Sequence, residues 1–167
     1  MLVVDEATAE QIDIGALRTF FRRPLIADTQ ALAERRPDVA ILGAPYDLGV
    51  TNRPGARFGP HGVRTAAYYS GSYHLSFGIE IFDWLDVVDA GDVWCPHGQP
   101  GRCHANIEAR VAEIAELGIL PVIIGGDHSI TAHVGHALAR VHGAGRIGVI
   151  HFDAHADTAD EIEGNLA

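Results

Sequence analysis

Four side chains near the end of the sequence have the types and the spacing of metal ligands. Asp153, His155 and Asp157 alternate within the segment DAHAD, and His128 lies in the segment GGDHS. Residues two apart on an extended chain point to the same side, so the first three can converge on one point. Carboxylates and imidazoles without a thiolate favour Mn²⁺ over a structural zinc site, with Fe²⁺, Co²⁺, Ni²⁺ and Zn²⁺ as alternatives.

A structural role for each residue alone is the competing interpretation. A single Asp or His at the end of a strand is usually a cap or a hydrogen-bonded polar group. Several carboxylates gathered at the end of a buried strand would repel one another, and a bound cation removes that repulsion. We therefore predict a metal site at these four residues. Asp127, beside His128, could orient a ligand or cap the following helix.

Alternating strands and helices are expected to position these residues. Apolar runs bounded by turn residues predict four strands, over 38–45, 84–92, 119–126 and 146–155. Helical patterns follow over 60–70, which opens with Pro60, over 105–118, and over 129–143, with Ser129 as a plausible N-cap. Helix-length connections between strands indicate a parallel sheet covered on both faces. Ligands of such sheets bind at the carboxyl ends of the strands, where GGDHS and DAHAD fall.

Composition sets the broad class of the protein. The 167 residues suit one domain, residues 38–167, preceded by an N-terminal arm, residues 1–37, whose basic and aromatic stretch 18–25 should be exposed. No run approaches the roughly 18 apolar residues of a membrane span, and we expect no secretory signal. The net charge of −10 disfavours nucleic acid and anionic membranes as partners. Two cysteines are too few for a disulfide framework, so a cytoplasmic location is expected.

The paired segments GGDHS and DAHAD resemble the first two signatures of the ureohydrolase family, which includes arginase, agmatinase and guanidinobutyrase. The loop TNRPGARFGP looks most like the agmatinase and guanidino-acid branch, and the resemblance runs from about Val39 to the last residue. It implies an arginase-like, three-layer α/β/α domain with a mainly parallel sheet and two Mn²⁺ ions. His128 and Asp157 would bind one ion, His155 the other, and Asp153 both.

The resemblance also implies a reaction. A hydroxide that bridges the two ions would attack the guanidinium carbon of a linear substrate such as agmatine or guanidinobutyrate, and urea would leave. Asp157 would be the catalytic residue that orients the hydroxide. Arg53 and Asn165 are candidate contacts to the substrate, although an arginine in a turn-rich loop more often holds its own turns or a subunit contact. The family is usually trimeric or hexameric, so a homo-oligomer is expected.

One family signature is missing from the sequence. A further Asp-x-Asp pair and an acidic residue for the guanidinium lie in the C-terminal half of family members. We therefore expect a chain truncated before the C-terminal strands, which alone binds metal weakly, releases no urea, and aggregates or recruits a partner. The alternatives are a non-catalytic fragment or partner subunit and, with less support, a zinc deacetylase of related fold.

Two other groups of candidate ligands carry weaker signals. The set Cys95, His97, Cys103 and His104 has an irregular spacing that fits no zinc pattern. His133 and His136 share a helical face but have no carboxylate companion in the sequence around them, so a solvated or interface role is expected.

Overall fold

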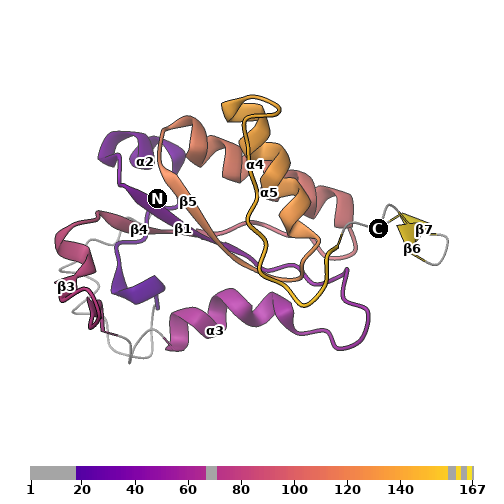
Figure 1. The fold of residues 1–167 in the computed structure, drawn as a ribbon, viewed down its shortest axis with the longest axis horizontal. Coiled ribbons are helices and arrows are strands. Elements are labelled where there is room, and N and C mark those ends of the chain that lie inside the picture. Colours follow the sequence, from indigo (N-terminus) through magenta and orange to yellow (C-terminus); the bar gives the residue numbers. More distant parts are fainter. Residues whose placement is uncertain (1–17, 67–70, 158–160, 163–164, 167) are drawn as a thin grey trace.

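The computed structural model describes residues 18–66, 71–157, 161–162 and 165–166. Its centre is a three-stranded parallel sheet in which β1 lies between β4 and β5 (Figure 1). The strands are Val39–Ala44 (β1), Val87–Asp92 (β4) and Leu120–Gly125 (β5). Three of the four strands that the apolar runs predict are therefore confirmed, as is their parallel pairing.

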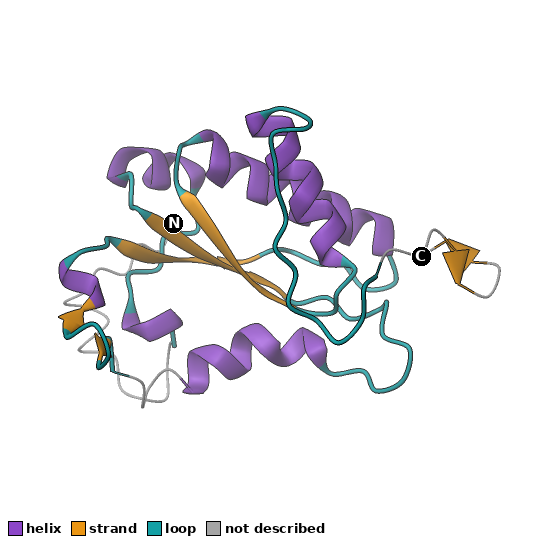
Figure 2. Ribbon diagram, viewed as in Figure 1, coloured by secondary structure: helices purple, strands orange, loops and turns teal. Residues whose placement is uncertain are grey.

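Helices lie on both faces of this sheet (Figure 2). The α-helices are α2 (Thr29–Arg35), α3 (Gly59–Ala66), α4 (Pro100–Glu116) and α5 (Ile130–His142). Short 3₁₀ turns are η1 (Phe20–Arg22), η2 (Ala56–Phe58) and η3 (Ile81–Asp83). Two small antiparallel hairpins pair β2 (Tyr73–His74) with β3 (Ile79–Glu80) and β6 (Glu161–Ile162) with β7 (Asn165–Leu166). No helix among the described residues is long and apolar enough to span a membrane.

The side chains of β1 alternate between the two helical layers. Ala40 and Leu42 belong to a core cluster with Leu32 of α2, Ile107 of α4 and Ala137 of α5. The residues between them, Val39 and Ile41, belong to a second cluster, which holds Phe20 of η1 and packs against Val63 of α3. Because strand side chains alternate in direction, one buried strand serves both cores. The three-layer α/β/α class predicted from the sequence is confirmed.

The segment 18–25 is not the exposed arm that its composition suggests. Thr19 and Phe20 are buried, and that expectation is wrong for them. The Phe20 N–H donates to the carboxylate of the buried Asp89 at 2.9 Å, and the guanidinium of Arg64 lies 4.0 Å from the centre of the Phe20 ring. Arg64 also donates two hydrogen bonds to Asp89, at 2.7 and 2.9 Å, so η1 and α3 are fastened to β4. The boundary between an arm and a domain at residues 37 and 38 stays a prediction.

The fourth predicted strand, over 146–155, is absent from the structure. These residues form a loop, in which Val149, Ile150 and Phe152 are 74%, 84% and 93% exposed. An apolar run becomes a strand when neighbouring backbone and side chains receive it, since strand preference depends on packing. Among the described residues, no strand pairs with this segment and no layer covers its apolar side chains.

Candidate metal centre

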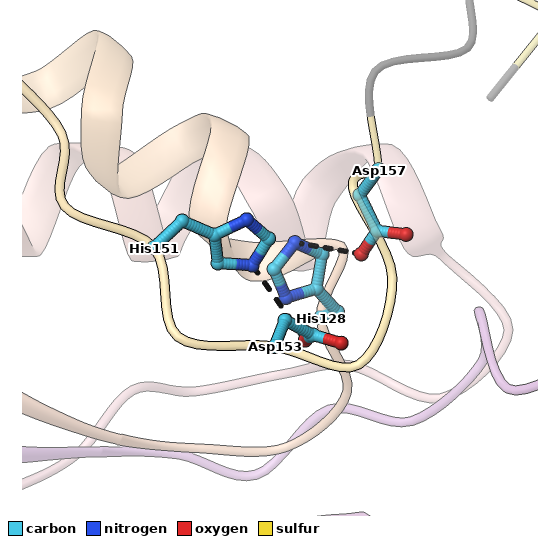
Figure 3. A group of neighbouring side chains, drawn as sticks. All are labelled: His128, His151, Asp153 and Asp157. Atoms are coloured by element: carbon cyan, nitrogen blue, oxygen red, sulfur yellow. Dashed lines mark ion pairs between the residues drawn. The ribbon is translucent and has the colours of Figure 1, made fainter.

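Four side chains with metal-binding atoms meet beyond the carboxyl end of β5 (Figure 3). They are His128, His151, Asp153 and Asp157, and one ligand atom from each lies within 4.8 Å of the others. His128 Nε2 is 3.1 Å from Asp157 Oδ2, and His151 Nε2 is 3.6 Å from Asp153 Oδ2. Three of the four residues predicted from the sequence are thus brought together. His151 was missed, although it continues the same alternation two residues before Asp153.

Two separate pieces of chain supply these side chains. His128 lies in the turn between β5 and α5, and the other three lie on the segment that follows α5 and returns to the end of β5 (Figures 1 and 3). Asp157 has a left-handed backbone conformation, with φ of 48°, which an aspartate adopts more readily than most residues. The side chains therefore converge although residues 146–155 do not form the expected strand.

His155, the fourth predicted ligand, lies next to this group. Its side chain is 82% exposed, and its Nδ1 is 3.5 Å from Asp153 Oδ1. The other oxygen of the same carboxylate, Oδ2, faces His151. The two oxygens of Asp153 therefore face two different imidazoles, which is the placement that a carboxylate shared by two ions requires.

Asp153 is held in its ionised form. Its pKa lies below the ordinary value of an aspartate, chiefly because the backbone N–H of His155 donates to its carboxylate at 2.9 Å. The imidazoles of His151, His128 and His155 lower this pKa further, against the opposing effect of burial. A carboxylate must be deprotonated to bind a metal, so this environment prepares Asp153 to act as a ligand.

The turn that carries His128 depends on a close backbone approach at Gly126. A Cβ atom on this residue would lie 1.9 Å from Tyr46 O and 2.8 Å from Ala44 O. The neighbouring Asp127 accepts hydrogen bonds from Gly49 N at 2.7 Å, from Ser129 N at 3.0 Å and from Ser129 Oγ at 2.5 Å. Asp127 therefore ties the turn to the loop after β1. Ser129 occupies the N-cap position of α5, but its side chain makes no capping hydrogen bond, contrary to the expectation from the sequence.

We predict that Gly126→Ala lowers the free energy of unfolding by about 1–3 kcal/mol, because the added methyl group overlaps backbone atoms that cannot move independently. The matched control is Gly135→Ala on α5, where a Cβ atom would meet nothing within 4 Å. Alanine favours a helix interior over glycine by roughly 0.5–1 kcal/mol, so the control should be neutral or stabilising. Urea denaturation of both variants measures the difference. Equal stability of the two variants would contradict the close approach.

The two predicted substrate contacts stay predictions. Arg53 is exposed in the loop between β1 and η2 and does not belong to the four-residue group. This loop is held at the buried carboxylate of Asp47, which accepts from Gly55 N at 2.8 Å and from Arg57 N at 3.2 Å. The Arg57 guanidinium also donates to Asp47 and lowers the pKa of that carboxyl to about 2. Asn165 lies in β7, and its side chain is outside what the structure describes.

The two weaker groups have different outcomes. Within the described ranges, Cys95, His97, Cys103 and His104 do not gather into a ligand group. Burial raises the pKa of the Cys95 thiol to about 12, which disfavours the thiolate that zinc needs. The expectation that His133 and His136 lack a carboxylate companion is wrong. Helix packing, which the local sequence does not reveal, brings Glu108 of α4 within 3.5 Å of His133 Nδ1.

Comparison with known proteins identifies the class to which this fold and ligand group belong. Residues 37–166 match the Arginase family. The chain therefore belongs to the arginase family. It is 42% identical over 128 residues to the mitochondrial agmatinase of Gallus gallus, which covers 76% of this chain and 37% of that protein. It is 36% identical over 153 residues to the guanidinobutyrase of Pseudomonas aeruginosa, which covers 90% of this chain and 46% of the relative.

Solved structures agree with this assignment. A hypothetical agmatinase from Burkholderia thailandensis superposes with a TM-score of 0.78 and 33% identity, over 92% of this chain and 47% of that one. A formiminoglutamase from Trypanosoma cruzi, solved with Mn²⁺, superposes with a TM-score of 0.58 and 29% identity, over 68% of this chain and 40% of that one. The chain thus spans less than half the length of these relatives.

Proposed function

We propose that this chain supplies much of the metal centre of a manganese-dependent amidinohydrolase, which releases urea from a linear guanidino compound. The single observation that carries the proposal is the position of Asp153, whose two oxygens face different histidines beside the contact between His128 and Asp157. The relatives named above include an agmatinase and a guanidinobutyrase, so agmatine and guanidinobutyrate are the leading substrates. The Mn²⁺ in the formiminoglutamase structure supports the choice of metal.

The residues fit such a pair of ions. Carboxylate oxygens and imidazole nitrogens suit Mn²⁺, and the group contains no thiolate. His128 and Asp157 would hold one ion, His155 the second, and Asp153 both. Two such ions, when bound, lower the pKa of a shared water so that a nucleophile exists near neutral pH.

The protein's own groups orient the reaction. Asp157 is in contact with His128 Nε2 at 3.1 Å and is 39% exposed, so one carboxylate oxygen can accept a hydrogen bond from the attacking water. His151 stacks on His128 with ring centres 5.2 Å apart and limits the rotation of that imidazole. The exposed position of the group leaves room for a substrate and for further ligands.

The proposal is tested by urea release. A longer polypeptide that joins this chain to the remaining length of its relatives is incubated with Mn²⁺ and, separately, with agmatine, guanidinobutyrate, guanidinopropionate and arginine. We expect Mn²⁺-dependent urea from agmatine or guanidinobutyrate, and none from the 167-residue chain alone. Absence of urea with all four compounds, together with one bound Zn²⁺ per chain, would overturn the proposal in favour of a deacetylase.

A second candidate is a non-catalytic partner subunit of such an enzyme. The observation in its favour is the exposed apolar surface formed by Leu120, Val149, Ile150 and Phe152. Large exposed apolar patches often mark surfaces that another chain covers. Copurification with a longer arginase-family chain would favour this candidate. The proposed homo-oligomer and a cytoplasmic location stay predictions, and the Gallus gallus relative is a mitochondrial protein.

A further inference from the structure

A second group of metal-binding atoms lies on α4 and α5 and shares no residue with the group around Asp153. Glu108 lies on α4, and His133 and His136 lie one turn apart on α5. One ligand atom from each of the three is within 4.8 Å of the other two. Glu108 Oε2 is 3.5 Å from His133 Nδ1 and 3.9 Å from His136 Nδ1, so one carboxylate oxygen faces both imidazoles.

His133 has a polar atom that needs a partner. Its Nδ1 is shielded from solvent and makes no hydrogen bond among the described residues. A buried nitrogen without a partner costs roughly 1–3 kcal/mol. At 3.5 Å, Glu108 Oε2 lies too far away for a good hydrogen bond but close enough to share a cation with this nitrogen.

The ring of His133 is held in the orientation that this sharing needs. The imidazole of His104 stacks on it with ring centres 4.3 Å apart and an interplanar angle of 19°. His104 is itself fixed, because its Nε2 lies 3.0 Å from Ser129 Oγ. Burial, and then the neighbouring His133, lower the pKa of His104, so the supporting ring is uncharged at neutral pH. An uncharged neighbour does not repel a bound cation.

Arg140 contacts the same carboxylate from the other side. Its guanidinium lies 3.9 Å from Glu108 Oε1, so the oxygen that faces the histidines, Oε2, is left available. The arginine is 55% exposed, so solvent screens its charge. Arg140 therefore orients Glu108, and it also opposes a cation at the site to a small extent.

We propose that Glu108 Oε2, His133 Nδ1 and His136 Nδ1 bind one Zn²⁺ ion between α4 and α5, with water at the fourth position. Two imidazoles and one carboxylate form a typical zinc ligand set with an open position. Bonds of about 2.0 Å in a tetrahedral site place the ligand atoms about 3.3 Å apart. The observed separations of 3.5 and 3.9 Å are close to this value, and His136 is 70% exposed and can rotate to complete the site.

The test is a Zn²⁺ titration against a chromophoric chelator. The starting protein is the chain with Asp153→Asn and Asp157→Asn, exposed changes that disable the other ligand group. We expect one Zn²⁺ per chain, and an affinity at least about tenfold lower after His136→Ala or Glu108→Gln. His142→Ala is the matched control, since His142 is an exposed histidine on the same helix outside the group, and it should leave the affinity unchanged.

A further variant tests the role of Arg140. Arg140→Gln removes the opposing charge and should raise the Zn²⁺ affinity roughly 1.5- to 5-fold. Circular dichroism of each variant checks that α4 and α5 remain folded. The proposal is overturned if the starting protein binds no Zn²⁺, or if a folded His136→Ala variant binds it as tightly as the His142→Ala control.

Discussion

Asp153→Asn should lower urea release by the longer enzyme at least about a thousandfold, because metal ions supply several kilocalories per mole of transition-state stabilisation. Asparagine keeps the shape of the side chain but has no charge, and only one of its two terminal atoms can accept a lone-pair bond. It therefore cannot be shared by two ions. The Mn²⁺ content of the purified protein, measured by mass spectrometry, should fall together with the rate of urea release.

The control for this change is Asp83→Asn, at an exposed aspartate in η3 outside the ligand group. Both the rate of urea release and the Mn²⁺ content of this variant should match those of the unmodified enzyme. If Asp153→Asn instead keeps its Mn²⁺ and most of its rate, Asp153 is not the shared ligand. The proposed chemistry would then need a different centre.

The second large effect separates His155 from His151. We expect His155→Ala to lower Mn²⁺ affinity at least about a hundredfold and His151→Ala about tenfold, since removing a ligand exceeds the 10- to 100-fold cost of removing a residue that orients one. His155 lies between the two aspartates of DAHAD and faces Asp153 Oδ1 at 3.5 Å. His151 precedes that signature and stacks on His128.

The two alanine variants form a matched pair, because each removes one imidazole that faces the same carboxylate. Quenching of the electron paramagnetic resonance signal of free Mn²⁺ measures the affinity and the number of ions bound. Loss of one ion in His155→Ala, with both retained in His151→Ala, is the expected result. The reverse order of effects would identify His151, which the structure places in the four-residue group, as the ligand.

The local sequence predicts the central sheet because each of its strands carries a complete signal. The runs that became β1, β4 and β5 are apolar and end at turn residues, and helix-length connections leave only parallel pairing. The segment 146–155 has the same apolar signal but no partner among the described residues, so it is a loop. A strand depends on its neighbours as much as on its own residues.

The candidate site was predictable in part for a related reason. His128, Asp153 and Asp157 carry their signal in residue type and spacing, and they converge even without the fourth strand. The contact of Glu108 with His133 joins residues 25 positions apart on two helices, and no local pattern shows which faces of α4 and α5 meet. The burial of Phe20 depends on the distant carboxylate of Asp89 and was missed for the same reason.

An anomalous-diffraction map of the longer enzyme, crystallised with Mn²⁺ and recorded at the manganese absorption edge, tests the shared role of Asp153 most directly. We expect two peaks about 3.5–4 Å apart. One should contact His128 and Asp157, the other His155, and the carboxylate of Asp153 should lie between them. A map with no manganese beside Asp153, or with the imidazole of His128 turned away from both peaks, would contradict this account.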